Sequence, residues 1–229
     1  MAIGTYSELL TAAQNWMARS DADIQARIPE FIALTEGVLS WGFEDPQYPI
    51  PRLRVRQMEA RDEASVDAEY ENISNWVSDF LELRQAKVNS DPVVDLQYLT
   101  PQEFDRRYVS SQGGDPKAFT IIGSQFRFGP IPSSAVDVEI QYYQKIPALT
   151  ALATTNWLLT ASPNIYLYGV LYHAAPYVQN AGVGVDADLV SDTLYWHRMF
   201  AGAVNGMNTA DKMSRYGGML MSRPGISVV

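Results

Sequence analysis

The stretch PQYPIPRLRVRQ at residues 46–57 decides the fold, because the character of the sequence changes there. Its three prolines cannot continue a helix, so they mark the end of a helical region. After them arginines occupy every second position, and this period of two predicts a strand with a basic face: Arg52, Leu53, Arg54, Val55, Arg56 and Gln57. Working outward from this stretch, we expect helices before it and a β region after it.

The first 43 residues predict two helices. Thr5 and Glu8 have the spacing of a capping box, and apolar residues at helical spacing follow as far as Met17. Residues 20–23 offer a break and a second N-cap. Residues 24–41 then repeat apolar side chains every three and four positions, which predicts an amphipathic helix.

Residues 52 to about 145 predict an antiparallel β region of five to seven strands. Strands are expected at 80–88, at 91–99 and from 136 to 147, and residues 119–128 predict a hairpin that turns at Gly123-Ser124. A short helix is expected between these strands, because Thr100, Pro101 and Glu103 combine a capping box with proline at the first helical position.

Helices are predicted again from about residue 156. Ser162 and Pro163 supply an N-cap and a first helical residue for one helix that ends near Tyr177. A long helix is expected from about 186 to 216. Gly202 and Gly206 stand four apart on one face of it, and each glycine costs a helix roughly 1 kcal/mol relative to alanine. We therefore expect a neighbouring backbone to pack against that face.

These elements predict an α+β fold. The N- and C-terminal helices form one helical bundle, an antiparallel β domain is inserted between them, and an extended tail follows. The predicted bounds are 1–44 and 149–216 for the bundle, 45–148 for the β domain and 217–229 for the tail. Separate α, β and α modules remain the alternative.

The tail that begins at Gly217-Gly218 is apolar and basic. No acidic residue follows Asp211, although the chain has a formal net charge of -9. Exposed Met, Leu, Ile and Val side chains gain free energy only by being covered, and the tail is too short to form a core of its own. We therefore expect another chain to cover it.

The composition excludes several classes of protein. The absence of cysteine excludes a disulfide scaffold, a thiolate metal site and a cysteine nucleophile. We expect no signal peptide and no transmembrane helix, because neither pattern occurs. An acidic chain of this kind has no general attraction for nucleic acid or for anionic membranes.

The sequence also offers no site for catalysis or for a cofactor. His173 and His197 lack a second ligand at metal-binding spacing, and there is no Gly-x-Ser-x-Gly elbow and no phosphate-binding loop. Carboxylates such as Glu69, Glu71 and Glu82 are interpreted as solvated. A Ser-His-Asp triad has members distant in the chain, so the sequence does not test for one. We expect no enzyme activity, no metal and no cofactor.

Eight stretches in colinear order resemble the adaptor proteins (head-to-tail connectors) of tailed bacteriophages. They cover nearly the whole chain, which makes the likeness more specific than any single motif. The stretches are TYSEL at 5–9, IPEFIAL at 28–34, LRVRQM at 53–58, DFLELR at 79–84, YLTPQEF at 98–104, YYQKIPAL at 142–149, NWLL at 156–159 and YLYG at 166–169.

The resemblance implies a structural virion protein at the capsid–tail junction, assembled in the host cytoplasm. About twelve subunits would form a ring between the portal protein and a tail protein (a nozzle, tail-tube or completion protein). DNA would pass through the ring without sequence-specific binding.

The residues that we expect to bind the portal are Arg215, Tyr216, Met219, Leu220, Met221, Arg223 and Ile226. The residues that we expect at subunit interfaces are Arg52, Arg54, Arg56, Gly202 and Gly206. For the three arginines we expect protein contacts rather than DNA readout. The alternative function is that of a tail-associated protein that binds or degrades host-surface glycans.

Overall fold

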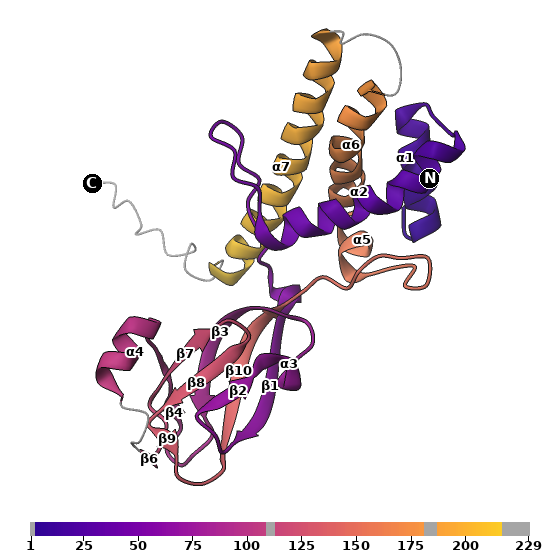
Figure 1. The fold of residues 1–229 in the computed structure, drawn as a ribbon. Helices are drawn as coiled ribbons and strands as arrows, with labels where there is room; N and C mark the ends of the chain where they lie inside the picture. The colour runs from indigo at the N-terminus through magenta and orange to yellow at the C-terminus, as the bar shows by residue number, and fades with distance from the viewer. Residues whose placement is uncertain (1–2, 109–112, 181–186, 217–229) are drawn as a thin grey trace, which may run out of the picture. The chain divides into compact units, whose positions relative to one another are not determined.

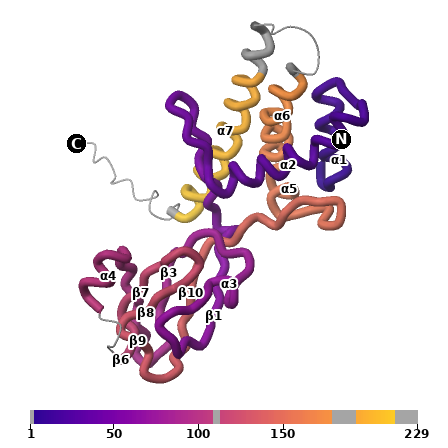
Figure 2. Tube along the Cα trace, viewed as in Figure 1, coloured from indigo at the N-terminus to yellow at the C-terminus, as the bar shows by residue number. Residues whose placement is uncertain are grey.

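The computed structural model describes residues 3–108, 113–180 and 187–216 (Figure 1). The chain divides into two compact units. The helical unit comprises Met1–Gln57 with Ile146–Val229, and the β unit comprises Met58–Lys145. The Cα trace runs from helices into the β unit and back into helices (Figure 2). The fold is therefore α+β, as predicted.

Within the described residues, the helical unit contains α1 (Tyr6–Met17), α2 (Ala22–Trp41), α5 (Trp157–Ala161), α6 (Pro163–Asn180) and α7 (Ala187–Tyr216). Helix α6 contacts each of the other four helices. In Figure 1 it lies between α7 and α1, and α2 crosses in front of it. The buried apolar side chains of this unit include Leu9, Ile28, Ile32, Tyr166, Val170, Phe200 and Val204.

Helices α2 and α6 approach each other closely at Gly169. A Cβ atom at this position would lie 2.8 Å from Oγ1 of Thr35, and closer still to its methyl group. Thr35 is itself buried, and its hydroxyl donates a hydrogen bond of 2.8 Å to the carbonyl oxygen of Phe31. Only glycine fits between these helices without displacing one of them.

The β unit has three sheets and two short helices among its described residues. The strand orders are β1-β10-β3-β4, β2-β8-β7-β5 and β6-β9. The elements are β1 (Glu59–Val66), β2 (Tyr70–Asn72), α3 (Ile73–Trp76), β3 (Phe80–Val88), β4 (Val94–Asp95), β5 (Gln97–Tyr98), α4 (Pro101–Arg107), β6 (Gly113–Gly114), β7 (Ala118–Ile122), β8 (Gln125–Gly129), β9 (Ile131–Pro132) and β10 (Val136–Gln144).

Strand β10 organises the first sheet, because it pairs antiparallel with both β1 and β3. Its alternate residues Val138, Ile140 and Tyr142 are buried in the apolar core of the unit. Since successive side chains of a strand point to opposite faces, Asp137 and Glu139 lie on the other face of the sheet. That polar face is important for the charge distribution described below.

Several local predictions are confirmed. Thr5 and Thr100 each form a complete capping box, and the second helix begins with Pro101. The predicted strand at 80–88 is β3. The predicted hairpin is β7 paired antiparallel with β8, and Gly123 in its turn has a φ of 63°, a value that favours glycine.

The predicted strand at 52–57 is wrong. Residues 51–55 form no ladder with any described strand, and Arg56–Met58 form a short 3₁₀ helix, η1. The alternation of burial is nevertheless present, because Leu53 and Val55 are fully buried. The prediction of a single strand at 91–99 is also wrong. These residues form two short strands, β4 and β5, which belong to separate sheets. Strand β5 pairs with β7 in parallel.

Candidate assembly site on the last helix

The segment of residues 43–57, called the strap below, connects α2 to the β unit and contacts α7 at three points. It begins after Gly42, which ends α2 with a φ of 77° that favours glycine. A Cβ atom at Gly42 would also lie 3.1 Å from the carbonyl oxygen of Ile50. Two backbone hydrogen bonds of 2.9 Å then join Phe43 and Ile50, so the first part of the strap folds back on itself.

The first contact with α7 is made by Tyr48. Its carbonyl oxygen is hydrogen-bonded to Nε2 of His197, a side chain that is only 6% exposed. Its hydroxyl accepts a hydrogen bond of 2.7 Å from Arg198, whose guanidinium carbon lies 4.8 Å from the centre of the tyrosine ring. Asp45 shapes the turn, because its carboxylate accepts hydrogen bonds of 2.8 Å from the N–H groups of Gln47 and Tyr48.

The second contact is made by the side-chain amide of Asn208. Its Oδ1 accepts a hydrogen bond of 3.0 Å from the N–H of Arg54, and its Nδ2 donates one of 2.9 Å to the carbonyl oxygen of Arg52. The N–H of Leu53, between them, donates to the carbonyl oxygen of Leu39 on α2 at 2.9 Å. Asn208 and Leu39 thus satisfy backbone groups that a strand would pair with another strand.

The third contact is made by Asp211, which is 8% exposed. Its Oδ1 accepts hydrogen bonds from the N–H of Arg56 at 3.2 Å and from Nε of Arg56 at 3.0 Å. Its Oδ2 accepts a hydrogen bond of 2.6 Å from Nε of Arg215. Arg56 also donates to the hydroxyl of Ser214. Burial by itself would raise the pKa of Asp211, but the hydrogen bonds from Arg215 and Arg56 hold it below its usual value.

A shallow hollow of about 280 Å³ lies where the end of the strap meets α7. Its lining combines the buried Asp211 with apolar and polar groups from both segments: Val55, Arg56, Gln57, Met207, Ala210, Asp211 and Ser214. This end of the helical unit is the candidate assembly site, because two predicted groups of site residues meet there.

The predicted arginines are placed as follows. Arg54 donates to the carbonyl oxygens of Leu53 at 2.7 Å and Ser40 at 3.0 Å, and Arg56 binds Asp211. The side chain of Arg52 is exposed. Arg54 and Arg56 therefore bind groups of the helical unit itself.

No sequence pattern identifies Asn208 as a functional residue, and none assigns a role to Asp211. The sequence contains one signal for Asp211. It is the last acidic residue of the chain, and Lys212, Arg215 and Arg223 follow it. Asn208 has no such signal, because it contacts backbone atoms about 155 residues away in the sequence.

The other predicted interface residues lie on α7. Gly202 and Gly206 are exposed, and a Cβ atom at either position would meet no atom within 4 Å in the described residues. Arg215 is held by Asp211, and Tyr216 ends α7. The predicted portal-binding residues Met219, Leu220, Met221, Arg223 and Ile226 lie outside the described residues.

Over the described ranges there is no group of three or more His, Cys, Asp or Glu side chains placed to hold a metal ion. Burial lowers the pKa of His173 to about 4, which leaves its imidazole neutral near pH 7. Among the helices that the structure describes, none combines the length and the apolar character needed to cross a membrane.

The comparison with protein families decides the class of this protein. The family model described as "SU10 adaptor protein" matches residues 4–223, nearly the whole chain. The chain belongs to the SU10 adaptor protein family. Members of this family are structural adaptor proteins of bacteriophages. No curated protein matches the sequence significantly.

Proposed function

We propose that this protein is a head-to-tail adaptor, of which about twelve copies form a ring between the portal and a tail protein. In this proposal DNA passes through the ring, the protein performs no catalysis, and its place is the capsid–tail junction of the virion. The ring would assemble in the host cytoplasm. The observation that carries the proposal is the family match over residues 4–223, which includes both the helical unit and the β unit.

The geometry of α7 supports the proposed docking of the portal. Asp211 binds Arg56 of the strap and Arg215 in the last turn of α7, so the end of the helix is tied to the rest of the helical unit. We propose that this end presents residues 217–229 to the portal. The apolar residues of that segment would be covered in the complex, and the absence of Asp and Glu from it would favour an acidic partner surface.

A portal-binding assay tests this proposal. The purified chain is mixed with portal rings from the same virus, and the mass of the complex is measured by native mass spectrometry. We expect a portal-dependent step of about twelve subunit masses, because subunits bound at repeated sites reinforce one another. Deletion of residues 217–229 should abolish the step while circular dichroism and the melting temperature of the free chain stay unchanged.

A matched control separates docking from a general loss of apolar surface. Leu152 is 98% exposed and lies outside the tail, so Leu152→Ser removes an exposed apolar side chain without affecting the docking segment. This variant should bind portal rings like the original chain, whereas Leu220→Ser should bind them more weakly. Unchanged binding by the truncated chain would refute docking through the tail. No association at near-physiological salt, together with binding to host glycans, would favour the alternative function.

A further inference from the structure

The first sheet of the β unit leaves most of one edge of β3 without a neighbouring strand. On one side β3 pairs with β10 along its length, but on the other side β4 pairs with it only at Lys87 and Val88. One further backbone hydrogen bond of 2.9 Å runs from the N–H of Leu96 to the carbonyl oxygen of Ala86. Residues 80–85 therefore have no described strand on that side. An open edge of this length can pair with a strand from another chain.

The second sheet has a similar open edge at β7. Strand β5 pairs with β7 only at Ala118 and Phe119, so residues 120–122 have β8 on one side and no described strand on the other. The segment of residues 94–98 links the two edges, because it begins with β4, which pairs with β3, and ends with β5, which pairs with β7. The chain itself thus places an extended segment along both edges.

Both edges continue beyond the point where this segment leaves them. Residues 94–98 run antiparallel to β3, toward its start at Phe80, and parallel to β7, toward its end at Ile122. The chain then leaves the edges for α4, whose N-cap is Thr100. A strand from another chain that continued the line of residues 94–98 would therefore lie beside residues 80–85 of β3.

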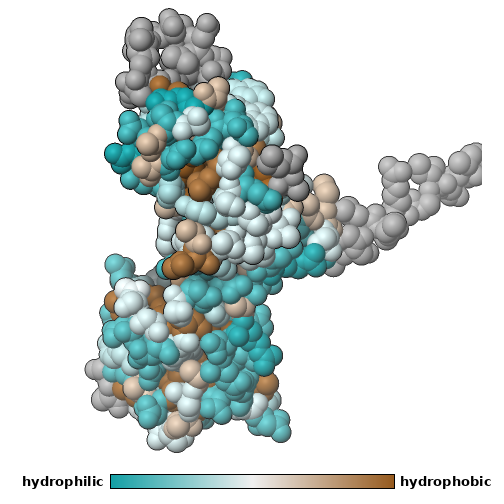
Figure 3. Space-filling model, turned by 90° about the vertical axis from the view of Figure 1, so that its right-hand side faces the viewer, coloured by the Kyte–Doolittle hydropathy of each residue, from teal (hydrophilic) through white to brown (hydrophobic). Residues whose placement is uncertain are grey.

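A groove of about 650 Å³ lies at this place, between residues of β3 and β7. Five apolar or aromatic side chains contribute to its lining: Phe80, Leu83, Tyr98, Phe119 and Ile121. The ring of Tyr98 is exposed and packs edge-on against Phe119, with 5.6 Å between the ring centres. Hydrophilic residues cover much of the face of the β unit that Figure 3 shows. An apolar groove in such a unit gains free energy when a partner covers it.

The charge of the β unit indicates which segments suit this groove. Residues 58–145 contain 15 acidic and 8 basic side chains, a net charge of -7 out of the -9 of the whole chain. This charge attracts cationic partners and repels anionic ones. When a strand is added to a sheet edge, the neighbouring pockets select its side chains at alternate positions. The partner that fits is an extended segment with apolar residues at alternate positions, with Lys or Arg beside them and without Asp or Glu.

We propose that an extended segment of the tail protein, with this chemistry, adds a strand to the open edge of β3 and places its apolar side chains in the groove. The inference rests on the proposed function, in which the ring has two protein partners and residues 217–229 bind the portal. That assignment leaves the β unit for the tail protein. The added strand would pair antiparallel with β3, as β4 does.

The experiment measures the binding of synthetic peptides to the full chain by fluorescence anisotropy. The probes are labelled, overlapping peptides that cover the tail proteins of the same virus, each of about 15 residues, which is long enough to span residues 80–85 of β3 with flanking residues. At least one peptide with the stated pattern should bind. Methylation of every second backbone nitrogen of that peptide removes the donors on one side of its strand. In one of the two phases this change should weaken binding by about tenfold or more, because the hydrogen bonds to β3 are lost.

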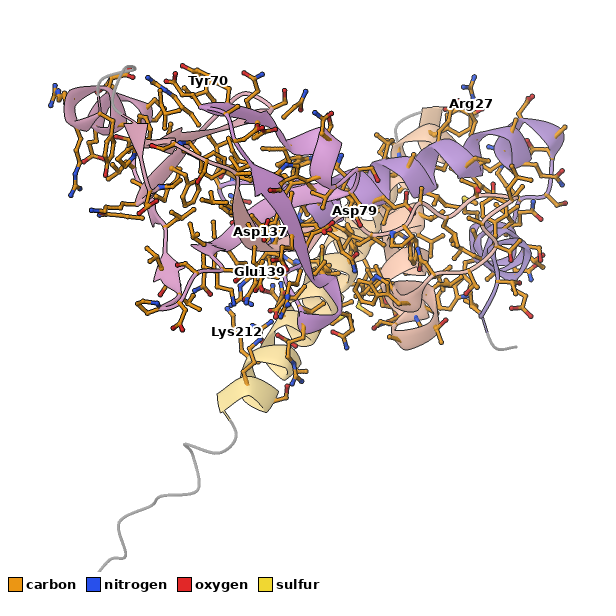
Figure 4. The ribbon with its side chains drawn as sticks, turned by 90° about the horizontal axis from the view of Figure 1, so that it is seen from below. Arg27, Tyr70, Asp79, Asp137, Glu139 and Lys212 are labelled. Atoms are coloured by element: carbon orange, nitrogen blue, oxygen red, sulfur yellow. The ribbon has the colours of Figure 1, made fainter. Side chains whose placement is uncertain are left out.

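A variant of the groove and a matched control test the place of binding. Tyr98→Ser removes an exposed aromatic wall of the groove and should weaken binding of the peptide by about tenfold or more. The control is Tyr70→Ser, since Tyr70, labelled in Figure 4, is also an exposed tyrosine but lies on β2, at the opposite edge of the second sheet. It should leave binding unchanged. The melting temperature of each variant shows whether its fold is kept.

Hydrogen exchange of the original chain gives a measurement that needs no variant. The bound peptide should slow exchange in residues 80–85 of β3 and leave β1, at the other edge of the first sheet, unchanged. The absence of any bound peptide, equal weakening by Tyr98→Ser and Tyr70→Ser, or protection that does not include β3 would each overturn the inference.

Peptides from other sources keep the outcomes distinct. Peptides from the portal protein and a peptide of residues 217–229 are tested in the same assay, and binding of either to the groove in place of the tail-protein peptides would overturn the inference. Binding to portal rings is measured in parallel. Portal binding that persists while no tail-protein peptide binds would refute this contact and leave the proposed function intact. A bound tail-protein peptide without a portal-dependent step would refute the docking to the portal and leave the contact in the groove.

Discussion

Two segments in which buried residues alternate with more exposed ones adopt different structures in this protein. Residues 80–88 form β3, which lies between β10 and β4 in the first sheet, and their alternation is interrupted once, at Arg84 and Gln85. Residues 52–57 also alternate in burial, but they belong to the strap and pair with no described strand. The backbone of β3 bonds to other strands, whereas the backbone of the strap bonds to Asn208 and Asp211 on a helix. A period of two therefore predicts which side chains are buried, and distant residues decide what the backbone pairs with.

The strap and β3 should differ in how much a single substitution destabilises them. A strand in a ladder has many equivalent hydrogen bonds, so the loss of one side chain leaves most of its backbone paired. The end of the strap depends on two side chains of α7 and on one backbone bond to α2. Substitutions in α7 should therefore release the strap, while comparable substitutions in the sheet should leave β3 and β10 in place.

Replacement of Asp211 by alanine should have the largest effect. The change leaves the N–H of Arg56 and the guanidinium groups of Arg56 and Arg215 without their carboxylate. We expect a loss of about 3 kcal/mol, chiefly from the N–H of Arg56 and from Arg215, because the guanidinium of Arg56 is 55% exposed and can turn to water. Trypsin cleavage after Arg56 should accelerate as the strap is released. Lys212→Ala, at the exposed neighbouring position, should leave the cleavage rate unchanged. A rate for the Asp211 variant equal to that of the original chain would contradict the role of this residue as an anchor.

Acid should reproduce this effect in the original chain. The pKa of Asp211 is lowered in the folded state, so its ionised form contributes stability above the pKa of an unfolded aspartate, about 3.9. That contribution is lost as the pH falls through the lowered folded value. The protection of the strap's backbone amides, taken as the observed exchange rate relative to the intrinsic rate at the same pH, should therefore fall below about pH 4, and Asp211→Asn should remove this part of the pH dependence.

Replacement of Asn208 by alanine should have the second largest effect, about 2 kcal/mol, because two hydrogen bonds to the backbone are lost together. Faster hydrogen exchange at Arg54, measured by mass spectrometry, would show the release of its N–H. Thr209→Ala changes an exposed neighbour and should leave this exchange rate unaffected. Unaltered exchange at Arg54 in the Asn208 variant would mean that the packing of Leu53 and Val55 alone holds the strap.

The features predicted correctly from the sequence are those that short-range interactions determine. The capping boxes at Thr5 and Thr100 and the turn at Gly123 depend on residues within a few positions, so the local sequence contains the information. The anchors of the strap are about 155 residues away, and a single side-chain amide leaves no periodic pattern. The parallel pairing of β5 with β7 has the same origin, because two residues of ladder are too few to produce a pattern.

The candidate site likewise combines local features that the sequence indicated with a long-range contact that it did not. The sequence indicated the arginines of the strap, the glycines of α7 and the last turn of the helix as separate features. It did not indicate that Asp211 joins the first feature to the last. The basic character of the end of the chain is visible in the sequence, but only the folded structure reveals that Arg56 and Arg215 both bind Asp211.

Replacement of Glu139 by alanine should have a smaller effect than replacement of Asp211, although both carboxylates bind two cations. Arg61 and Arg56 are both more than half exposed, so either guanidinium can turn to water when its carboxylate is lost. The difference is that Asp211 also accepts a backbone N–H of the strap, whereas β10 keeps its backbone bonds to β1 and β3. Hydrogen exchange in β10 should stay slow in this variant. Exchange that accelerates throughout β10 would show that the sheet depends on this ion cluster as the strap depends on Asp211.

The smallest expected change in stability comes from Gly202→Ala, and its effect on association tests whether the exposed glycines of α7 lie at a subunit interface. Alanine at this position meets no atom within 4 Å, so the free chain should gain about 1 kcal/mol from the higher helix propensity. If the glycines of α7 form a subunit interface, the added methyl group should weaken association while it raises the melting temperature of the free chain. Gly37→Ala is the control, because it also meets no atom within 4 Å and lies on α2. It should stabilise the free chain equally and leave association unchanged. Equal association for both variants would remove Gly202 from the interface and leave its presence in the helix without a structural reason.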